Sequence, residues 1–245
     1  MARDLPAAQE FYRAVLGWSF RSTSLGDEFS VGLVDGEAVA GIGALASTLR
    51  TAVAWTPYFV VDDVNAATSR VRERSATVAV GPLAMKTGRG ALAADPDGAV
   101  FGLWEGRIIP GWSIGKGQGP ARLELRTRDA FAAAIFYGQV LQWAAEGAPG
   151  GTPGLDVHYE EDRVNVRDDG RTVCSLRGGA VGSAPDPRIR PRWQVSFRVP
   201  DVDAAEAAAV AAGGEVVAPA SSPPTGREAT LRDPDGGMFT VVSGH

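Results

Sequence analysis

Two long stretches of the chain resemble each other, and this internal repeat limits the possible folds more than any other feature. The clearest repeated motifs are Phe11-Tyr12 with Phe136-Tyr137, Trp18 with Trp143, Thr87-Gly88-Arg89 with Thr225-Gly226-Arg227, and Asp95-Pro96-Asp97-Gly98 with Asp233-Pro234-Asp235-Gly236. The aromatic motifs are offset by 125 residues and the later ones by 138. Motifs kept in one order over such a distance indicate a tandem duplication.

Each half contains a smaller repeat of strand, helix, strand, strand, strand. In the second quarter the expected elements cover residues 58–61, 64–74, 77–80, 90–94 and 100–104, and in the fourth quarter 194–199, 202–212, 215–217, 228–231 and 238–242. The third quarter, residues 122–176, has the same order. The offset grows because of a Gly- and Pro-rich insert at residues 147–156, which is typical of a loop. The Asp-Pro-Asp-Gly motif is expected to form the turn before the last strand.

The sequence therefore predicts an α+β fold of four βαβββ modules. A first domain covers residues 1–107, a linker with Pro110 and four glycines covers 108–119, and a second domain covers 120–245. One helix covers only one face of a four-stranded sheet, so modules should pair to close the other face. Two paired modules curve into a cup, which is a natural cavity for a ligand.

The first module lacks its opening strand. Asp129 follows the strand at 122–127, and its counterpart under the 125 offset is Asp4, so the matching strand falls before Met1. Either the start is misassigned or shortened, or another segment fills the gap. An unfilled gap leaves unpaired backbone groups beside the cup.

Composition excludes several classes of function. The formal net charge is −5, with 24 basic and 29 acidic residues, and phosphate backbones require a clustered basic face. No apolar run reaches the roughly 20 residues of a membrane helix, and no apolar signal segment follows Met1. The single cysteine, Cys174, fits a reducing compartment. We expect a cytoplasmic protein without nucleic-acid or membrane partners.

Together, the helical Phe-Tyr pair, Leu16-Gly17-Trp18, the strand leading into Val61-Asp62-Asp63-Val64 and the Asp-Pro-Asp-Gly turn resemble the vicinal oxygen chelate superfamily of glyoxalases, bleomycin resistance proteins and extradiol dioxygenases. The resemblance covers nearly the whole chain. It is greatest to two-domain actinobacterial glyoxalase-like proteins. It implies tandem glyoxalase-like domains.

The resemblance also implies where a divalent metal would bind. In the family, His, Gln or Glu side chains on the first and last strands of the modules hold the metal. The corresponding positions here are Thr56, Arg122 and Gln194 on first strands, and Gly41, Gly102, Ser175 and Thr240 on last strands. Only Gln194 is a plausible ligand, because such metals prefer several imidazole or carboxylate groups. We expect no metal and no other cofactor.

Strand alternation predicts the lining of two cups, since residues two apart share a face. The first cup is aromatic and apolar, with Thr56, Tyr58 and Trp104, and suits a planar ligand. The second is polar, with Arg122, Glu124, Arg126, Gln194, Arg198 and Thr240. Its arginines suit a carboxylate or phosphate. The alternatives are core packing for Tyr58 and Trp104, and an ordinary solvent-facing sheet for the polar set.

Two reactive residue types have simpler explanations. Cys174 lies in the middle of a strand, where a buried inert thiol is expected rather than a nucleophile. His158 is next to the acidic run Glu160-Glu161-Asp162 and is expected in a solvated loop. No Ser-His-Asp set, phosphate loop or zinc pattern is present in the sequence.

Three functions remain compatible with the sequence. The first is metal-independent binding of a small, aromatic molecule in a sheet cup. The alternative is a lyase, isomerase or dioxygenase-type tailoring enzyme, either metal-independent or with an atypical metal site. A scaffold with vestigial cups is the third. Since duplication places two cups in one chain, a monomer is possible, while the missing strand leaves an edge for a homodimer.

Overall fold

The computed structural model describes residues 1–109, 112–143, 155–179, 190–223 and 226–243. The helices are α1 (Leu5–Leu16), α2 (Ala46–Leu49), α3 (Val64–Glu73), α4 (Ala130–Leu141) and α5 (Val202–Ala211). The strands are β1 (Ser19–Thr23), β2 (Gly26–Val34), β3 (Glu37–Gly43), β4 (Tyr58–Val60), β5 (Thr77–Met85), β6 (Gly88–Ala94), β7 (Val100–Gly106), β8 (Arg122–Arg126), β9 (Leu155–Tyr159), β10 (Arg163–Asp168), β11 (Arg171–Arg177), β12 (Arg192–Arg198), β13 (Glu215–Ser221), β14 (Glu228–Arg232) and β15 (Met238–Val242). No helix in the described ranges is long and apolar enough to cross a membrane.

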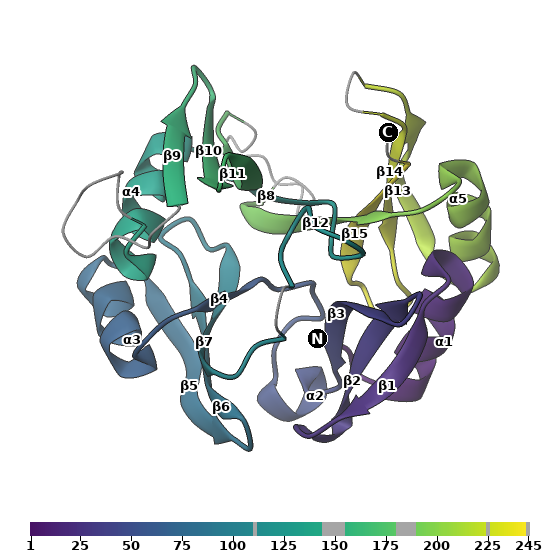
Figure 1. The fold of residues 1–245 in the computed structure, drawn as a ribbon, viewed down its shortest axis with the longest axis horizontal. Coiled ribbons are helices and arrows are strands. Elements are labelled where there is room, and N and C mark those ends of the chain that lie inside the picture. Colours follow the sequence, from purple (N-terminus) through teal and green to yellow (C-terminus); the bar gives the residue numbers. More distant parts are fainter. Residues whose placement is uncertain (110–111, 144–154, 180–189, 224–225, 244–245) are drawn as a thin grey trace. The chain divides into compact units, whose positions relative to one another are not determined.

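The predicted α+β fold of four modules is confirmed (Figure 1). The three complete modules have the same strand order, namely β4-β7-β6-β5, β8-β11-β10-β9 and β12-β15-β14-β13. In each, the first strand pairs in parallel with the last, and the other pairings are antiparallel. An aspartate precedes each module helix and caps it, because its carboxylate accepts backbone N–H bonds of the first turn. These caps are Asp4, Asp63, Asp129 and Asp201.

The first module has only three strands in the described residues, β1-β2-β3, as the sequence predicted. Two segments contact the outer edge of β3, where the first strand would pair. The amide of Ala2 donates to the Gly43 carbonyl at 2.8 Å, and the indole of Trp112 donates to the Val39 carbonyl at 2.9 Å. These bonds satisfy part of the edge left by the missing strand.

One local prediction is wrong. His158 lies on β9 and not in a loop, because β9 pairs antiparallel with β10 from Tyr159 to Leu155. The predicted loop at 147–156 therefore ends before Leu155, and its residues 147–154 lie outside the described part of the chain.

The chain forms two compact units that do not follow the sequence halves. The first unit contains residues 1–55, 109–122 and 194–245, so it combines the first and fourth modules. The second contains residues 56–108 and 123–193, which are the second and third modules. The predicted domains at 1–107 and 120–245 describe the two copies of the sequence repeat, and this division stays a prediction.

Each unit contains a matching set of six aromatic residues that pack together in its core. In the first unit these are Phe11, Tyr12, Trp18, Trp55, Phe197 and Phe239, and in the second Phe136, Tyr137, Trp143, Trp193, Phe59 and Phe101. Each member matches its counterpart at the 125 or 138 offset. Edge-to-face contacts dominate, which is the arrangement that aromatic quadrupoles favour.

A tyrosine, an aspartate and a tryptophan form a hydrogen-bonded clamp in each unit, partly buried in the first unit and buried in the second. In the first unit the Tyr12 hydroxyl donates to Asp233 Oδ2 at 2.7 Å and accepts the indole N–H of Trp55 at 2.9 Å. In the second unit the Tyr137 hydroxyl donates to Asp95 Oδ2 at 3.0 Å and accepts the indole N–H of Trp193 at 3.0 Å.

The aspartates of these clamps open the two Asp-Pro-Asp-Gly turns, so each turn does more than reverse the chain. Asp95 Oδ1 also accepts the amides of Asp97 and Ala99, which shapes its turn, while Oδ2 holds the helix of the paired module. Burial raises the pKa of Asp95, and its hydrogen bonds, including that from Tyr137, offset part of this effect. Each clamp therefore fastens one module to the other within a unit.

Replacing Tyr137 with phenylalanine should destabilise the second unit. The change leaves the buried Asp95 carboxylate and the Trp193 indole each without one partner, which costs about 1–3 kcal/mol. Urea unfolding followed by circular dichroism measures the loss. The matched control is Tyr159→Phe, because Tyr159 is 56% exposed and its hydroxyl makes no bond to the described residues. Equal unfolding midpoints for the two variants would contradict the clamp.

Candidate functional site

An aromatic surface covers one face of the β4-β7-β6-β5 sheet in the second unit. Tyr58 is paired with Gly102, and a methyl group added at Gly102 would lie 2.3 Å from the Tyr58 ring, so the ring lies directly over this glycine. Trp104 follows two residues later on the same face, and its ring lies 3.4 Å from the matching position at Gly90. Glycine is thus required at Gly102 by close approach.

The aromatic surface is partly open to solvent. Tyr58 is 44% exposed, and Trp104 is half-buried with its indole N–H donating to the Arg107 carbonyl at 3.1 Å. The prediction that both rings share one face is consistent with this register, and neither ring belongs to the core. Desolvation by burial raises the pKa of the Tyr58 hydroxyl to about 12. Thr56 lies just before β4 and is half-buried.

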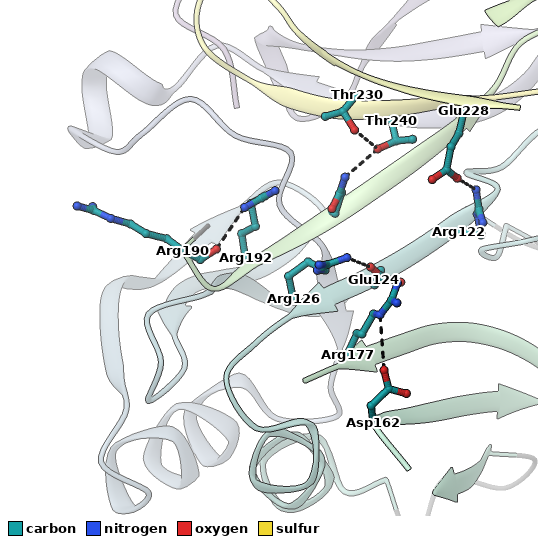
Figure 2. A network of polar contacts seen from close by, with 11 residues as sticks. Arg122, Glu124, Arg126, Asp162, Arg177, Arg190, Arg192, Glu228, Thr230 and Thr240 are labelled. Atoms are coloured by element: carbon teal, nitrogen blue, oxygen red, sulfur yellow. Dashed lines mark hydrogen bonds and ion pairs between the residues drawn. The ribbon is translucent and has the colours of Figure 1, made fainter. Parts of the chain in front are cut away.

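A polar face in the first unit contains four of the predicted binding residues, and Figure 2 labels two of them, Arg122 and Thr240. The Gln194 amide nitrogen donates to Thr240 Oγ1 at 2.9 Å, and Thr240 Oγ1 lies 3.3 Å from Thr230 Oγ1. Arg122 forms a 2.7 Å ion pair with Glu228. Arg198 donates to the Gly119 carbonyl at 2.7 Å. Arg122 and Arg198 therefore already have partners within their own unit.

The remaining two predicted residues lie on β8 in the second unit. Arg126 Nη1 is 3.3 Å from Glu124 Oε1, which is an ion pair between residues two apart on one face of the strand. Burial lowers the pKa of Arg192, and the nearby charge of Arg126 lowers it further. The structure thus divides the predicted polar set between the two units, and a common site for its arginines stays a prediction.

The side chains at the expected metal positions do not fit a divalent cation. The ring of Tyr58 covers Gly102, and Gln194 uses its amide nitrogen to bind Thr240. The Ser175 hydroxyl donates to Asn165 Oδ1 at 2.7 Å. In the described ranges, no three His, Cys, Asp or Glu side chains converge as metal ligands do.

The structure also brings in residues that the sequence reasoning missed. Arg177 lies directly opposite Arg126 on the neighbouring strand. Strand alternation contains the signal, because Arg177 is two residues from Ser175, which is one of the expected metal positions. Trp55 and Trp193 were missed as well, although they match each other at the 138 offset.

Comparison with known proteins matches each half of the chain to a glyoxalase-type family model. Residues 1–103 match the family described as Glyoxalase/Bleomycin resistance protein/Dioxygenase superfamily, and residues 122–242 match the one described as Glyoxalase-like domain. The chain is 32% identical over 247 residues to the Mycobacterium bovis protein named "Putative glyoxylase CFP32", covering 98% of this chain and 90% of that protein. It is 31% identical over 258 residues to the Streptomyces peucetius "Anthracycline biosynthesis protein DnrV", covering 98% and 89%.

Solved structures show the fold alone. A Mn(II)-bound glyoxalase from Novosphingobium aromaticivorans matches with a TM-score of 0.53 and 14% identity, over 99% of this chain and 79% of that chain. A catechol 2,3-dioxygenase matches with a TM-score of 0.55 and 13% identity, over 99% and 85%.

Cys174 should be unreactive in the native protein. Its thiol is buried and its pKa is raised to about 12 by desolvation, so almost no thiolate forms near pH 8. Because Cys174 is the single cysteine, a thiol reagent such as dithionitrobenzoate reports on it alone. We expect slow labelling in buffer and full labelling within minutes in denaturant. Rapid labelling of the folded protein would show that the thiol is accessible.

Proposed function

The chain belongs to the glyoxalase/bleomycin resistance protein/dioxygenase superfamily, and we propose that it binds a small planar aromatic molecule on the Tyr58–Trp104 face without the metal of that family. The observation that carries the proposal is the seating of Tyr58 over Gly102. A ring that lies over a glycine and stays partly exposed leaves aromatic surface available, which suits stacking against a second ring. Trp104 extends this surface along the same strand.

The shape of the face supports binding over a structural role. A core ring is buried on both sides, whereas Tyr58 is 44% exposed. The aromatic core of the same unit lies on the opposite face of this sheet, where Phe101 and Leu103 are fully buried. Tyr58 and Trp104 are therefore additional to the core and free to contact a ligand.

Stacking of a ligand on aromatic rings needs no metal. The side chains at the expected metal positions are compatible with such metal-free binding. At the positions that hold the family metal, the described side chains include hydroxyls, an amide, an arginine and glycines. The arginine at Arg122 would repel a cation, and its charge is already paired with Glu228. We therefore propose binding without metal chelation.

The relatives suggest a suitable probe. DnrV is named for anthracycline biosynthesis, and anthracyclines contain flat fused rings, so an anthracycline is a rational first ligand. The alternative function, a lyase, isomerase or dioxygenase-type tailoring enzyme, predicts that this bound probe is converted. Chromatography of the probe after prolonged incubation distinguishes the two, since a binding protein returns it unchanged.

Removing the aromatic face should weaken binding of the probe. In a titration followed by anthracycline fluorescence, Trp104→Leu and Tyr58→Leu should each lower the affinity about tenfold, which corresponds to the loss of a stacking contact of about 1–1.5 kcal/mol. The matched control is Trp112→Leu, because Trp112 is 41% exposed but lies in the first unit. Equal effects of all three substitutions would argue against the face.

A methyl group added at Gly102 tests the same face, because it would lie between the strand and the Tyr58 ring. The new carbon would lie 2.3 Å from the Tyr58 ring, so Gly102→Ala must displace that ring and weaken probe binding. Gly138→Ala is the control, because the nearest atom to its new carbon is 3.5 Å away. Unchanged affinity in Gly102→Ala would show that the seated ring is not part of the site.

Titration with Mn²⁺, Ni²⁺, Zn²⁺ and Fe²⁺ under anaerobic conditions tests the metal-free part of the proposal. We expect no stoichiometric binding by elemental analysis and no change in probe affinity. Uptake of one metal per chain would instead favour a metal-dependent enzyme.

A further inference from the structure

Three arginines form a row across neighbouring strands of the second unit. Arg163 on β10 is paired with Arg177 on β11, and Arg177 is paired with Arg126 on β8. Directly paired residues project to the same face of a sheet. The residues that alternate with them, Val164, Leu176 and Leu125, are fully buried, so the arginine row lies on the face turned away from the core.

This row is only partly neutralised by its own chain. Arg126 is paired with Glu124 at 3.3 Å, while the contact of Arg177 with Asp162 is long, at 3.9 Å, and the Asp162 side chain is 67% exposed. Exposed pairs of this kind contribute little. Arg163 makes no ion pair with any residue that the structure describes. Like charges directly opposite each other destabilise a sheet. A negatively charged group bound to the row would reduce this repulsion between the arginines.

The neighbouring polar groups leave the row open to an anion. Ser175 donates to Asn165 Oδ1 at 2.7 Å, and Asn165 Nδ2 donates to Glu160 Oε1 at 2.9 Å. The Glu160 amide bonds to the Arg163 carbonyl at 2.8 Å, but its carboxylate is held by Asn165 and forms no ion pair with the row among the described residues. Figure 2 shows Arg126, Glu124 and Arg177 together, with Asp162 beyond Arg177.

We propose that the row Arg163–Arg177–Arg126 binds the carboxylate or phosphate group of a small molecule, with Arg177 at its centre. Guanidinium groups bind either oxyanion through two parallel N–H···O bonds. Arg177 and Arg126 are partly exposed, at 41% and 32% of their side chains, so their donors are accessible. This site lies on a different sheet from the aromatic face and stands independently of it.

Glu124 acts as a competitor in this site. Its carboxylate occupies Arg126 when no ligand is present, so an incoming anion must share or displace that contact. Removing the charge of Glu124 should therefore strengthen anion binding, whereas removing an arginine should weaken it. A purely structural ion-pair network predicts no effect of either change on anion affinity.

Calorimetric titration of the whole chain with inorganic phosphate and with acetate, at constant ionic strength in chloride, tests the proposal. Neither probe has a ring, so the outcome is independent of the aromatic face. We expect saturable binding of at least one probe at one site per chain. Arg177→Gln and Arg163→Gln should each weaken it about tenfold or more, and Glu124→Gln should strengthen it by a few-fold.

Arg171→Gln is the matched control, because Arg171 is an exposed arginine six residues away on the same strand. It should leave the affinity unchanged, and circular dichroism should show that every variant is folded. Arg163→Gln keeps the test decisive if Arg177→Gln fails to fold, since Arg163 loses no ion pair within the described residues. Absence of saturable binding for both anions, or equal effects of Arg163→Gln and Arg171→Gln, would overturn the proposal. Binding of phosphate alone or acetate alone would identify which oxyanion the row accepts.

Discussion

The structure depends on the buried clamp in which a tyrosine hydroxyl joins an aspartate to a tryptophan indole. Each clamp unites a helix from one module with the turn that opens the last strand of another, and so creates a unit from two modules. Buried hydroxyl and carboxylate groups are costly unless paired, so the clamp permits only the arrangement that satisfies all three partners. The six aromatic residues of each core, two of which belong to the clamp, contribute the apolar area that a single module lacks.

This constraint also determines which surfaces remain available for function. Because the clamp and the aromatic core occupy one face of each sheet, the residues of opposite parity are left on the other face. On β4 and β7 these residues are Tyr58, Gly102 and Trp104, and on β8 they are Glu124 and Arg126. The proposed binding faces follow from the core through strand alternation. Their different chemistry, aromatic in one sheet and cationic in the other, shows that the duplicated modules have diverged on the open side while the core has stayed the same.

Much of the fold could be predicted from the sequence. Residues 238–242 and 228–231 were expected as strands and form β15 and β14, because apolar alternation and the preceding turn are local signals. His158 was misplaced because its strand follows a Gly- and Pro-rich stretch and is short. The candidate site was harder to predict. Parity could place Tyr58 and Gly102 on one face, but their direct pairing, and with it the position of the Tyr58 ring over that glycine, depends on the register between β4 and β7.

The sequence by itself determined the modules, their turns and caps, and the absence of imidazole or carboxylate side chains from the expected metal positions, since each depends on residue type and local spacing. Only the tertiary structure decided which modules join. Tyr12 and Tyr137 lie in similar motifs, and so do Asp95 and Asp233, so the motifs alone do not distinguish the possible pairings. The structure joins Tyr12 to Asp233, 221 residues away, and Tyr137 to Asp95, 42 residues away. The physical reason is that the partner of each tyrosine depends on which two modules pack around the hydrogen bond. A motif that occurs in both halves of the chain does not specify that choice.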